Sequence, residues 1–282
     1  MEQHMPRPMT TAEKQRFRSY FPNLDVDQAV VTADASTVYN CISWTVGLTD
    51  RWLWPGSSIA DFDTFYRGYG RVQAGDGPIA AWGHSTSSMT HGCVSGPGHG
   101  PRWESKCGGD LRIQHGLSEL VGSTFGRVVA FYRRNPAVVP VYREILEESM
   151  TEKTAKAALT AAQKKMLREQ TSAVRSNLRR AFETAFEAWK STWFAGGLAI
   201  SSDTHTRTVG KEFDSLIALG PAILPLLIEK LTDPDNFLVL QLYDAIQPNE
   251  RLLVQYGPDD ERIVEGEQGR ARRVVQAWFA NQ

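Results

Sequence analysis

The amino-acid usage of this chain changes near residue 139, and this change limits the folds that it can adopt. Residues 1–135 are rich in glycine, serine and aromatic side chains, whereas the residues that follow carry alanine, leucine, lysine and glutamate at helical spacing. Short β-branched and aromatic runs between turn residues are typical of strands, and apolar residues three and four positions apart are typical of helices. The sequence therefore predicts an α+β domain followed by an all-α C-terminal half.

This pattern divides the chain into residues 1–135, residues 136–200 and residues 201–282. In the first segment, it predicts helices packed on an antiparallel meander of about four strands. The expected helices are residues 11–20, 39–47 and 61–69, and the expected strands are residues 78–84, 88–94, 102–107 and 126–132. Residues 21–37 are expected to form a polar loop.

The second and third segments are expected to be helical. Apolar side chains keep a spacing of three and four through residues 137–200, and Thr160 with Gln163 predicts a capping box. Residues 216–231 form an apolar run interrupted at Gly220, which resembles one HEAT-type helical hairpin. A solenoid needs at least about three repeats, so a single hairpin is expected to cap the first domain.

Charge and cysteine content restrict the classes of function. The chain has 31 basic and 32 acidic side chains, so it has no overall positive charge with which to bind nucleic acid or an anionic membrane. No stretch approaches the roughly 18 apolar residues that a membrane-spanning helix needs. The N-terminus lacks the apolar core of a signal peptide, and the three cysteines are too few for a disulfide framework. We therefore expect a cytoplasmic protein, or one exported without a cleaved signal peptide.

Side chains able to do chemistry are concentrated between residues 84 and 115. This stretch holds four of the six histidines and two of the three cysteines, which are His84, His91, His99, His115, Cys93 and Cys107. The third cysteine, Cys41, lies in the first turn of the expected helix at residues 39–47. Two interpretations fit this clustering, a thiol nucleophile and a zinc site.

In the first interpretation, Cys41 is the nucleophile. The positive end of a helix dipole and free backbone N–H groups favour a thiolate and can hold an oxyanion. His91, in the middle of a strand and flanked by small residues, would take the thiol proton and return it to the leaving group. The candidates for the third group, which orients the imidazole, are His115, Glu104 and Ser105, in that order. The alternative is structural, because free cysteines and strand histidines commonly pack in a core.

In the second interpretation, His91, Cys93 and Cys107 bind zinc together with His84 or His115. The spacing argues against it, since no pair of cysteines or histidines has the separation typical of zinc sites. We expect neither a metal nor a cofactor. His84 and His99 are expected to be a strand-end residue and a surface residue.

These residues also carry a resemblance. A cysteine at the start of a helix, a tryptophan three positions later and a histidine on an early strand resemble the papain-like cysteine peptidases of the NlpC type. The motifs YNCISW, TH, WESKCG and FGRVV, spread over about residues 30–134, are similar to an uncharacterised bacterial domain family. The resemblance implies Cys41 as nucleophile and His91 as base, with a supporting shell made of Asn40, Trp44, Ser105 and Lys106. Cys107 departs from the family pattern, which has a hydrophobic residue at that position, and Cys93 is a further difference.

The predicted function is a cysteine-dependent hydrolase or acyl-transfer enzyme acting on an amide or ester. A peptide, a protein or a cell-wall peptide would be its substrate, and a bacterial effector is one role that fits. The alternative is a non-catalytic module with an inactive papain-like core, which recognises a protein partner through its helical half. A small zinc-binding domain is the remaining alternative.

Overall fold

The computed structural model describes residues 5–95, 102–137, 159–257 and 259–281. Its N-terminal half is built on an antiparallel sheet with the strand order β1-β2-β7-β6-β5-β4-β8-β3. The strands are β1 (Arg7–Pro8), β2 (Val30–Ala33), β3 (Arg71–Ala74), β4 (Ile79–Ser85), β5 (Ser88–Val94), β6 (Trp103–Lys106), β7 (Arg112–His115) and β8 (Arg127–Arg134). The four predicted strands are β4, β5, β6 and β8. The expectation of a loop over residues 21–37 was wrong where β2 pairs with β7.

Three α-helices accompany the sheet: α1 (Thr11–Tyr20), α2 (Cys41–Thr45) and α3 (Ile59–Gly68). Capping boxes begin α1 and α3, and the side chain of Asn40 caps α2 by accepting from the backbone N–H of Ser43. The helix expected at residues 39–47 is therefore shorter than predicted, with five residues. It packs against β5 and β6.

The C-terminal half is helical, as predicted. Its α-helices are α5 (Ala161–Ala173), α6 (Ser176–Lys190), α7 (Lys211–Ile217), α8 (Leu224–Leu231), α9 (Val239–Ile246) and α10 (Gly266–Ala280). Short 3₁₀ helices occupy Leu117–Leu120, Gly196–Ile200, Thr204–Arg207, Pro221–Ile223, Pro234–Asn236, Glu250–Leu252 and Glu261–Glu265. None of the described helices is long and apolar enough to cross a membrane.

The helical prediction for residues 137–200 holds only in part. The predicted capping box of Thr160 and Gln163 begins α5, which confirms it. The helix is interrupted between α5 and α6, and after α6 it gives way to turns and a 3₁₀ helix. Residues 138–158 lie outside the described part of the chain.

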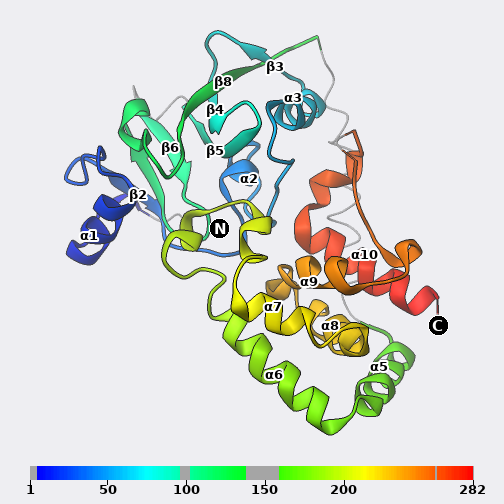
Figure 1. Cartoon of the computed structure of the whole chain (residues 1–282). Coiled ribbons are helices and arrows are strands. Elements are labelled where there is room, and N and C mark those ends of the chain that lie inside the picture. The colour runs from blue at the N-terminus through cyan, green and yellow to red at the C-terminus, as the bar shows by residue number, and fades with distance from the viewer. Residues whose placement is uncertain (1–4, 96–101, 138–158, 258, 282) are drawn as a thin grey trace.

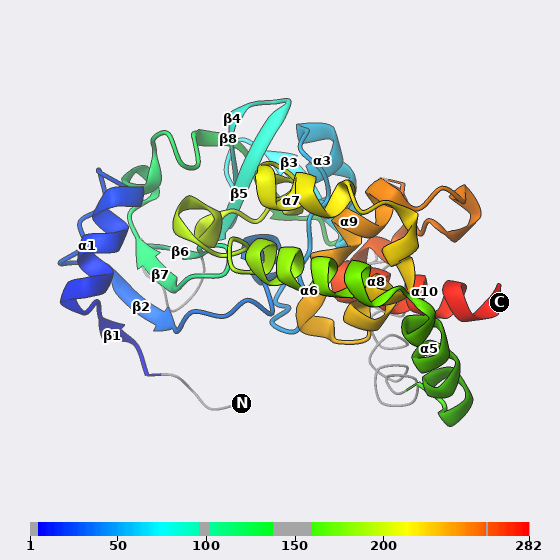
Figure 2. The same cartoon turned by 60° about the horizontal axis from the view of Figure 1, so that its bottom comes forward.

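The two halves are joined through Trp52. Its indole is buried in the core of the helical half, with ring centroids 5.5 Å from Phe237 and 5.8 Å from Phe194. Its backbone N–H donates to the side chain of Gln268 and its carbonyl accepts from the N–H of Glu267, both on α10. The helical half thus packs on the sheet half along a bonded interface, with the sheet to one side and α6, α8 and α10 to the other (Figures 1 and 2).

Residues 191–210, which we call the crossing segment, run from α6 to α7 by way of the sheet half (Figure 1). The N–H of Gly109 donates to the carbonyl of Ala199 at 2.7 Å. A Cβ on Gly108 would lie 2.5 Å from the carbonyl carbon of Ile200, so only glycine fits there without a shift. The crossing segment is therefore built into the sheet half by backbone contacts.

Candidate functional site

Cys41 is the first residue of α2 and is fully buried. The cap residue Asn40 is also buried, and its Nδ2 donates to the carbonyl of Leu53 at 2.6 Å. Its Oδ1 accepts from the backbone N–H of Ser43 at 3.1 Å. Asn40 thus fixes the start of α2 and the chain that returns beside it.

The thiol of Cys41 is closed off by the crossing segment. Its Sγ lies 3.0 Å from the Oγ of Ser202, which itself is buried. Burial raises the pKa of Cys41 to about 11, although hydrogen bonds from Ser202 and the Gly92 backbone and the charge of Lys106 act in the opposite direction. At neutral pH this cysteine is therefore a thiol and not a thiolate.

His91, Ser105 and His115 form one hydrogen-bonded chain. The Nε2 of His91 lies 2.8 Å from the Oγ of Ser105, which lies 2.8 Å from the Nε2 of His115. The Nδ1 of His115 lies 2.8 Å from the carbonyl oxygen of Gly116. A carbonyl oxygen only accepts, so this Nδ1 donates and the Nε2 of His115 accepts from Ser105. Ser105 then accepts from the Nε2–H of His91, which leaves the Nδ1 of His91 as a bare acceptor.

The side chains of His91, Ser105 and His115 are all buried. Burial lowers the pKa of His115 to about 4 and lowers the pKa of His91 well below its ordinary value. Both imidazoles are therefore neutral at pH 7. The Nδ1 of His91 is buried and has no partner among the described residues.

Cys41 and His91 do not form the predicted pair. Gly92 turns its Cα hydrogens toward α2, since a Cβ placed there would lie 3.1 Å from both Ile42 and Thr45. Neighbouring residues of a strand point to opposite faces, so His91 points away from α2. There its ring stacks on Phe125 at a centroid distance of 3.9 Å. Among the described residues, no hydrogen bond connects Cys41 with His91, and their partners are Ser202 and Ser105, respectively.

The remaining predicted residues hold the face of the sheet that α2 covers. The carboxylate of Glu104 forms an ion pair with the Nε of Arg112 at 3.0 Å, and the guanidinium of Arg112 lies 3.9 Å from the ring centroid of Trp44. The Nζ of Lys106 donates to three carbonyls, those of Ser36, Gly108 and Asp110, at 2.9, 2.5 and 2.7 Å. Burial lowers the pKa of Lys106 to about 7, while the electrostatic interactions with Cys107 and Asp110 act in the opposite direction.

The described residues contain no group of three or more histidine, cysteine or acidic side chains that could hold a metal ion. Cys93 and Cys107 are buried, and Cys93 accepts from the indole N–H of Trp82 at 3.2 Å. His84 is exposed at the end of β4, as expected. His99 lies outside the described residues.

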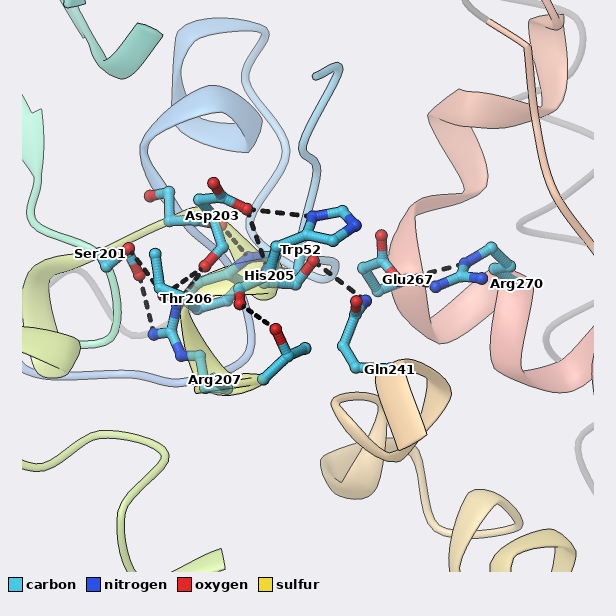
Figure 3. Close-up of polar contacts among 12 residues, drawn as sticks. Trp52, Ser201, Asp203, His205, Thr206, Arg207, Gln241, Glu267 and Arg270 are labelled. Atoms are coloured by element: carbon cyan, nitrogen blue, oxygen red, sulfur yellow. Dashed lines mark hydrogen bonds and ion pairs between the residues drawn. The ribbon is translucent and has the colours of Figure 1, made fainter. Parts of the chain in front are cut away.

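The role of the crossing segment was not predicted from the sequence. Its Arg207 is buried and donates to four carbonyls and one hydroxyl. These acceptors are the carbonyls of Trp193, Leu198, Ser201 and Asp203 and the hydroxyl of Thr206. Figure 3 shows Arg207 beside Ser201, Asp203 and Thr206. Eight consecutive polar residues, 201–208, carry this network, and that run was the available signal.

The crossing segment also forms one wall of a cleft of about 290 Å³. Ser201, Asp203 and Thr206 line this wall, and residues of the β4–β5 hairpin, among them Ser88 and Thr90, line the other. Oxygen-bearing side chains thus face one another across the cleft. Another cavity, of about 270 Å³, lies between the halves beside Val38 and Leu231 and is mostly apolar.

Residues 30–133 match the model of a family described as a domain of unknown function (DUF7689). No curated protein and no solved structure matches the chain. All eight predicted site residues, and the hairpin wall of the cleft, lie inside the matched range, whereas the crossing segment lies outside it. The chain is therefore similar to that family over its sheet half, and the cleft combines this half with a helical half that the family model does not cover.

Proposed function

We propose that this protein is a non-catalytic binding module that holds a small ligand in the cleft between its sheet half and its crossing segment. The observation that carries the proposal is that the thiol of Cys41 lies 3.0 Å from the hydroxyl of Ser202 while the Nε2 of His91 lies 2.8 Å from the hydroxyl of Ser105, so that the thiol and the imidazole have different partners. It favours the non-catalytic alternative of the sequence analysis, with the ligand site at the cleft rather than at the thiol.

The chemistry of a thiol enzyme explains why the different partners of Cys41 and His91 matter. The nucleophile must become a thiolate, and a base must lie within hydrogen-bond reach to take its proton. Cys41 instead lies against a hydroxyl of the crossing segment, and its pKa is raised to about 11. His91 donates to Ser105 and its ring stacks on Phe125, so its partners are these two residues and not the thiol.

The cysteine-dependent hydrolase or acyl-transfer enzyme is the second candidate. It is favoured by the position of Cys41 at the first residue of α2 and by the N–H of Gly92 beside the thiol. An active form would need the crossing segment to leave the thiol and β5 to turn, so that Cys41 could attack a carbonyl with His91 as base. A peptide, protein or cell-wall peptide would then be the substrate.

Native-state labelling with iodoacetamide, read by peptide mass spectrometry from pH 6 to pH 9, separates the two candidates. We expect the three native cysteines to react only as fast as the protein unfolds, because all three are buried. A Val209→Cys variant supplies an exposed control thiol, since Val209 is 84% exposed. That thiol should react at the rate of a free cysteine in the same sample.

Rapid labelling of Cys41 near pH 6, slowed by His91→Ala, would overturn the proposal in favour of the hydrolase. Labelling of Cys41 that rises in step with added urea, together with labelling of Cys93 and Cys107, would support it. The control thiol shows in either case that the reagent was active.

A further inference from the structure

The cleft between the crossing segment and the β4–β5 hairpin carries hydroxyl groups that the chain itself leaves unused. Ser57 and Ser88 line it, and no described residue hydrogen-bonds to either of their hydroxyls. Thr90 donates its hydroxyl proton to the carbonyl of Phe125 at 2.7 Å and can still accept a hydrogen bond, whereas Thr206 donates to the carbonyl of Asp203 and already accepts from Arg207. The walls can therefore both donate to a ligand and accept from it.

Asp203 gives the cleft its charge. It is the one charged residue among the described residues that line this cleft. Its Oδ1 accepts from the backbone N–H of His205 at 2.9 Å and lies 3.2 Å from the Nδ1 of the same residue. Among the described residues, none makes a hydrogen bond to its Oδ2. His205, when protonated, forms an ion pair with Asp203, and the guanidinium of Arg207 donates to the backbone carbonyl of Asp203 at 2.6 Å. The second carboxylate oxygen can bind a ligand that carries a positive charge.

The floor of the cleft is apolar. Met89, Phe125 and Ile200 line it and are buried. The ring of Phe125 is held in place by its stacking on His91. A flat or ring-shaped ligand body with C–H groups can pack on this floor while its polar groups meet the walls, which is how small-ligand pockets combine affinity with orientation.

We infer that this cleft binds a small organic cation that bears hydroxyl groups, of the kind represented by an amino sugar. The inference rests on the proposed function and specifies its ligand. The ammonium group would pair with Asp203, the hydroxyls of the ligand would bond to Ser57 and Ser88, and its ring would lie against the apolar side chains that line the cleft. The volume of about 290 Å³ suits one small molecule and not a polymer.

The test uses isothermal titration calorimetry with three probes that share one ring. Glucosamine carries a positive charge, glucose carries none and glucuronate carries a negative charge. We expect glucosamine to bind most tightly and glucuronate least tightly. Cyclohexylamine, which keeps the cation and lacks the hydroxyls, should bind more weakly than glucosamine.

Two variants assign the contacts. Asp203→Asn should weaken glucosamine binding by about 10-fold or more and leave glucose binding nearly unchanged, because it removes only the charge. Asp214→Asn, on the exposed face of α7, is the matched control and should change neither affinity. Ser57→Ala combined with Ser88→Ala should weaken glucosamine and glucose alike.

Equal binding of glucosamine and glucose would overturn the cationic ligand and leave the binding function standing. Equal binding of cyclohexylamine and glucosamine would overturn the hydroxyl contacts. Binding of none of the four probes to the folded protein would overturn this ligand class altogether. The labelling of Cys41 decides separately whether the proposed function itself fails.

Discussion

Two regions next to β5 gather polar side chains, and they differ in what they leave available to a ligand. In the interior, His91, Ser105 and His115 satisfy one another at 2.8 Å, apart from one imidazole nitrogen. In the cleft, the hydroxyls of Ser57 and Ser88 have no described partner in the chain. Buried polar groups that bond to each other stabilise a fold, whereas unused polar groups in an accessible cavity can bind something else.

The crossing segment connects these two regions. Ser202 faces the thiol of Cys41, while its neighbours Ser201 and Asp203 line the cleft. Alternate residues of one short segment therefore close the interior and shape the opening. The residues predicted as a site and the cleft therefore both depend on the contact between the crossing segment and the sheet half.

The largest expected effect comes from Arg207→Met, which removes the hydrogen-bond donor that holds the crossing segment together. Five acceptors lose their donor, and each buried acceptor left unsatisfied costs about 1–3 kcal/mol before relaxation. We expect the free energy of unfolding to fall by about 3–5 kcal/mol. Urea denaturation followed by tryptophan fluorescence measures it.

The matched control is Arg251→Met, because Arg251 is exposed. Its free energy of unfolding should stay within about 0.5 kcal/mol of the wild-type value. In the Arg207 variant, faster labelling of Cys41 and loss of glucosamine binding should appear together. If Cys41 were labelled faster while glucosamine binding stayed intact, or the reverse, the interior and the cleft would not depend on the same segment.

A medium effect is expected from pH, through the buried histidines. The pKa of His115 is about 4 in the folded protein, against 6.5 for a free side chain, so the unfolded chain binds this proton first as the pH falls. The stability that neutral His115 contributes is complete above pH 6.5 and is lost as the pH falls toward 4. At about 1.4 kcal/mol for each pKa unit, the loss amounts to about 3 kcal/mol, and His91 acts in the same direction.

The measurement is the free energy of unfolding at pH 7, 5.5 and 4 for the wild type and for His115→Gln. Glutamine can still reach Ser105 and does not titrate, so the variant should lose less stability between pH 7 and pH 4. Acidic groups titrate in both proteins, and their contribution cancels in the comparison. Parallel pH profiles would show that His115 is not buried as a neutral group.

Three of the four strands that could be predicted from the sequence are long. β4, β5 and β8 have seven or eight residues, enough for alternation or a β-branched run to be visible. The fourth, β6, has four residues, and the glycine pair after Cys107 marks its end in the sequence. β1 has two residues and β2, β3 and β7 have four, and periodicity alone did not reveal these short runs. The sheet is therefore wider than the predicted meander.

The candidate site shows a different limit. His91, Ser105 and His115 lie on strands that are close in the chain, and the structure joins them by hydrogen bonds, whereas the sequence offered His115, Glu104 and Ser105 as alternatives for one role beside His91. It could not tell which face of β5 α2 would cover, since that depends on packing and not on local pattern. Nor could it predict the contact of Cys41 with Ser202, which are 161 residues apart.

The smallest expected effect tests how closely the two halves approach, and it uses two glycines with the same backbone angle. Gly108 and Gly196 both have φ of +53°, so alanine at either position is strained, by about 1–2 kcal/mol. A Cβ on Gly196 would have no neighbour within 4 Å, whereas one on Gly108 would lie 2.5 Å from the backbone of Ile200. Gly108→Ala should therefore destabilise the protein by about 1–2 kcal/mol more than Gly196→Ala.

Urea denaturation of both variants measures that difference. Because the backbone strain is common to them, the difference reports only the contact between the sheet half and the crossing segment. Equal losses would mean that this contact yields easily, and the closure of Cys41 by Ser202 would then be too weak to keep the thiol buried.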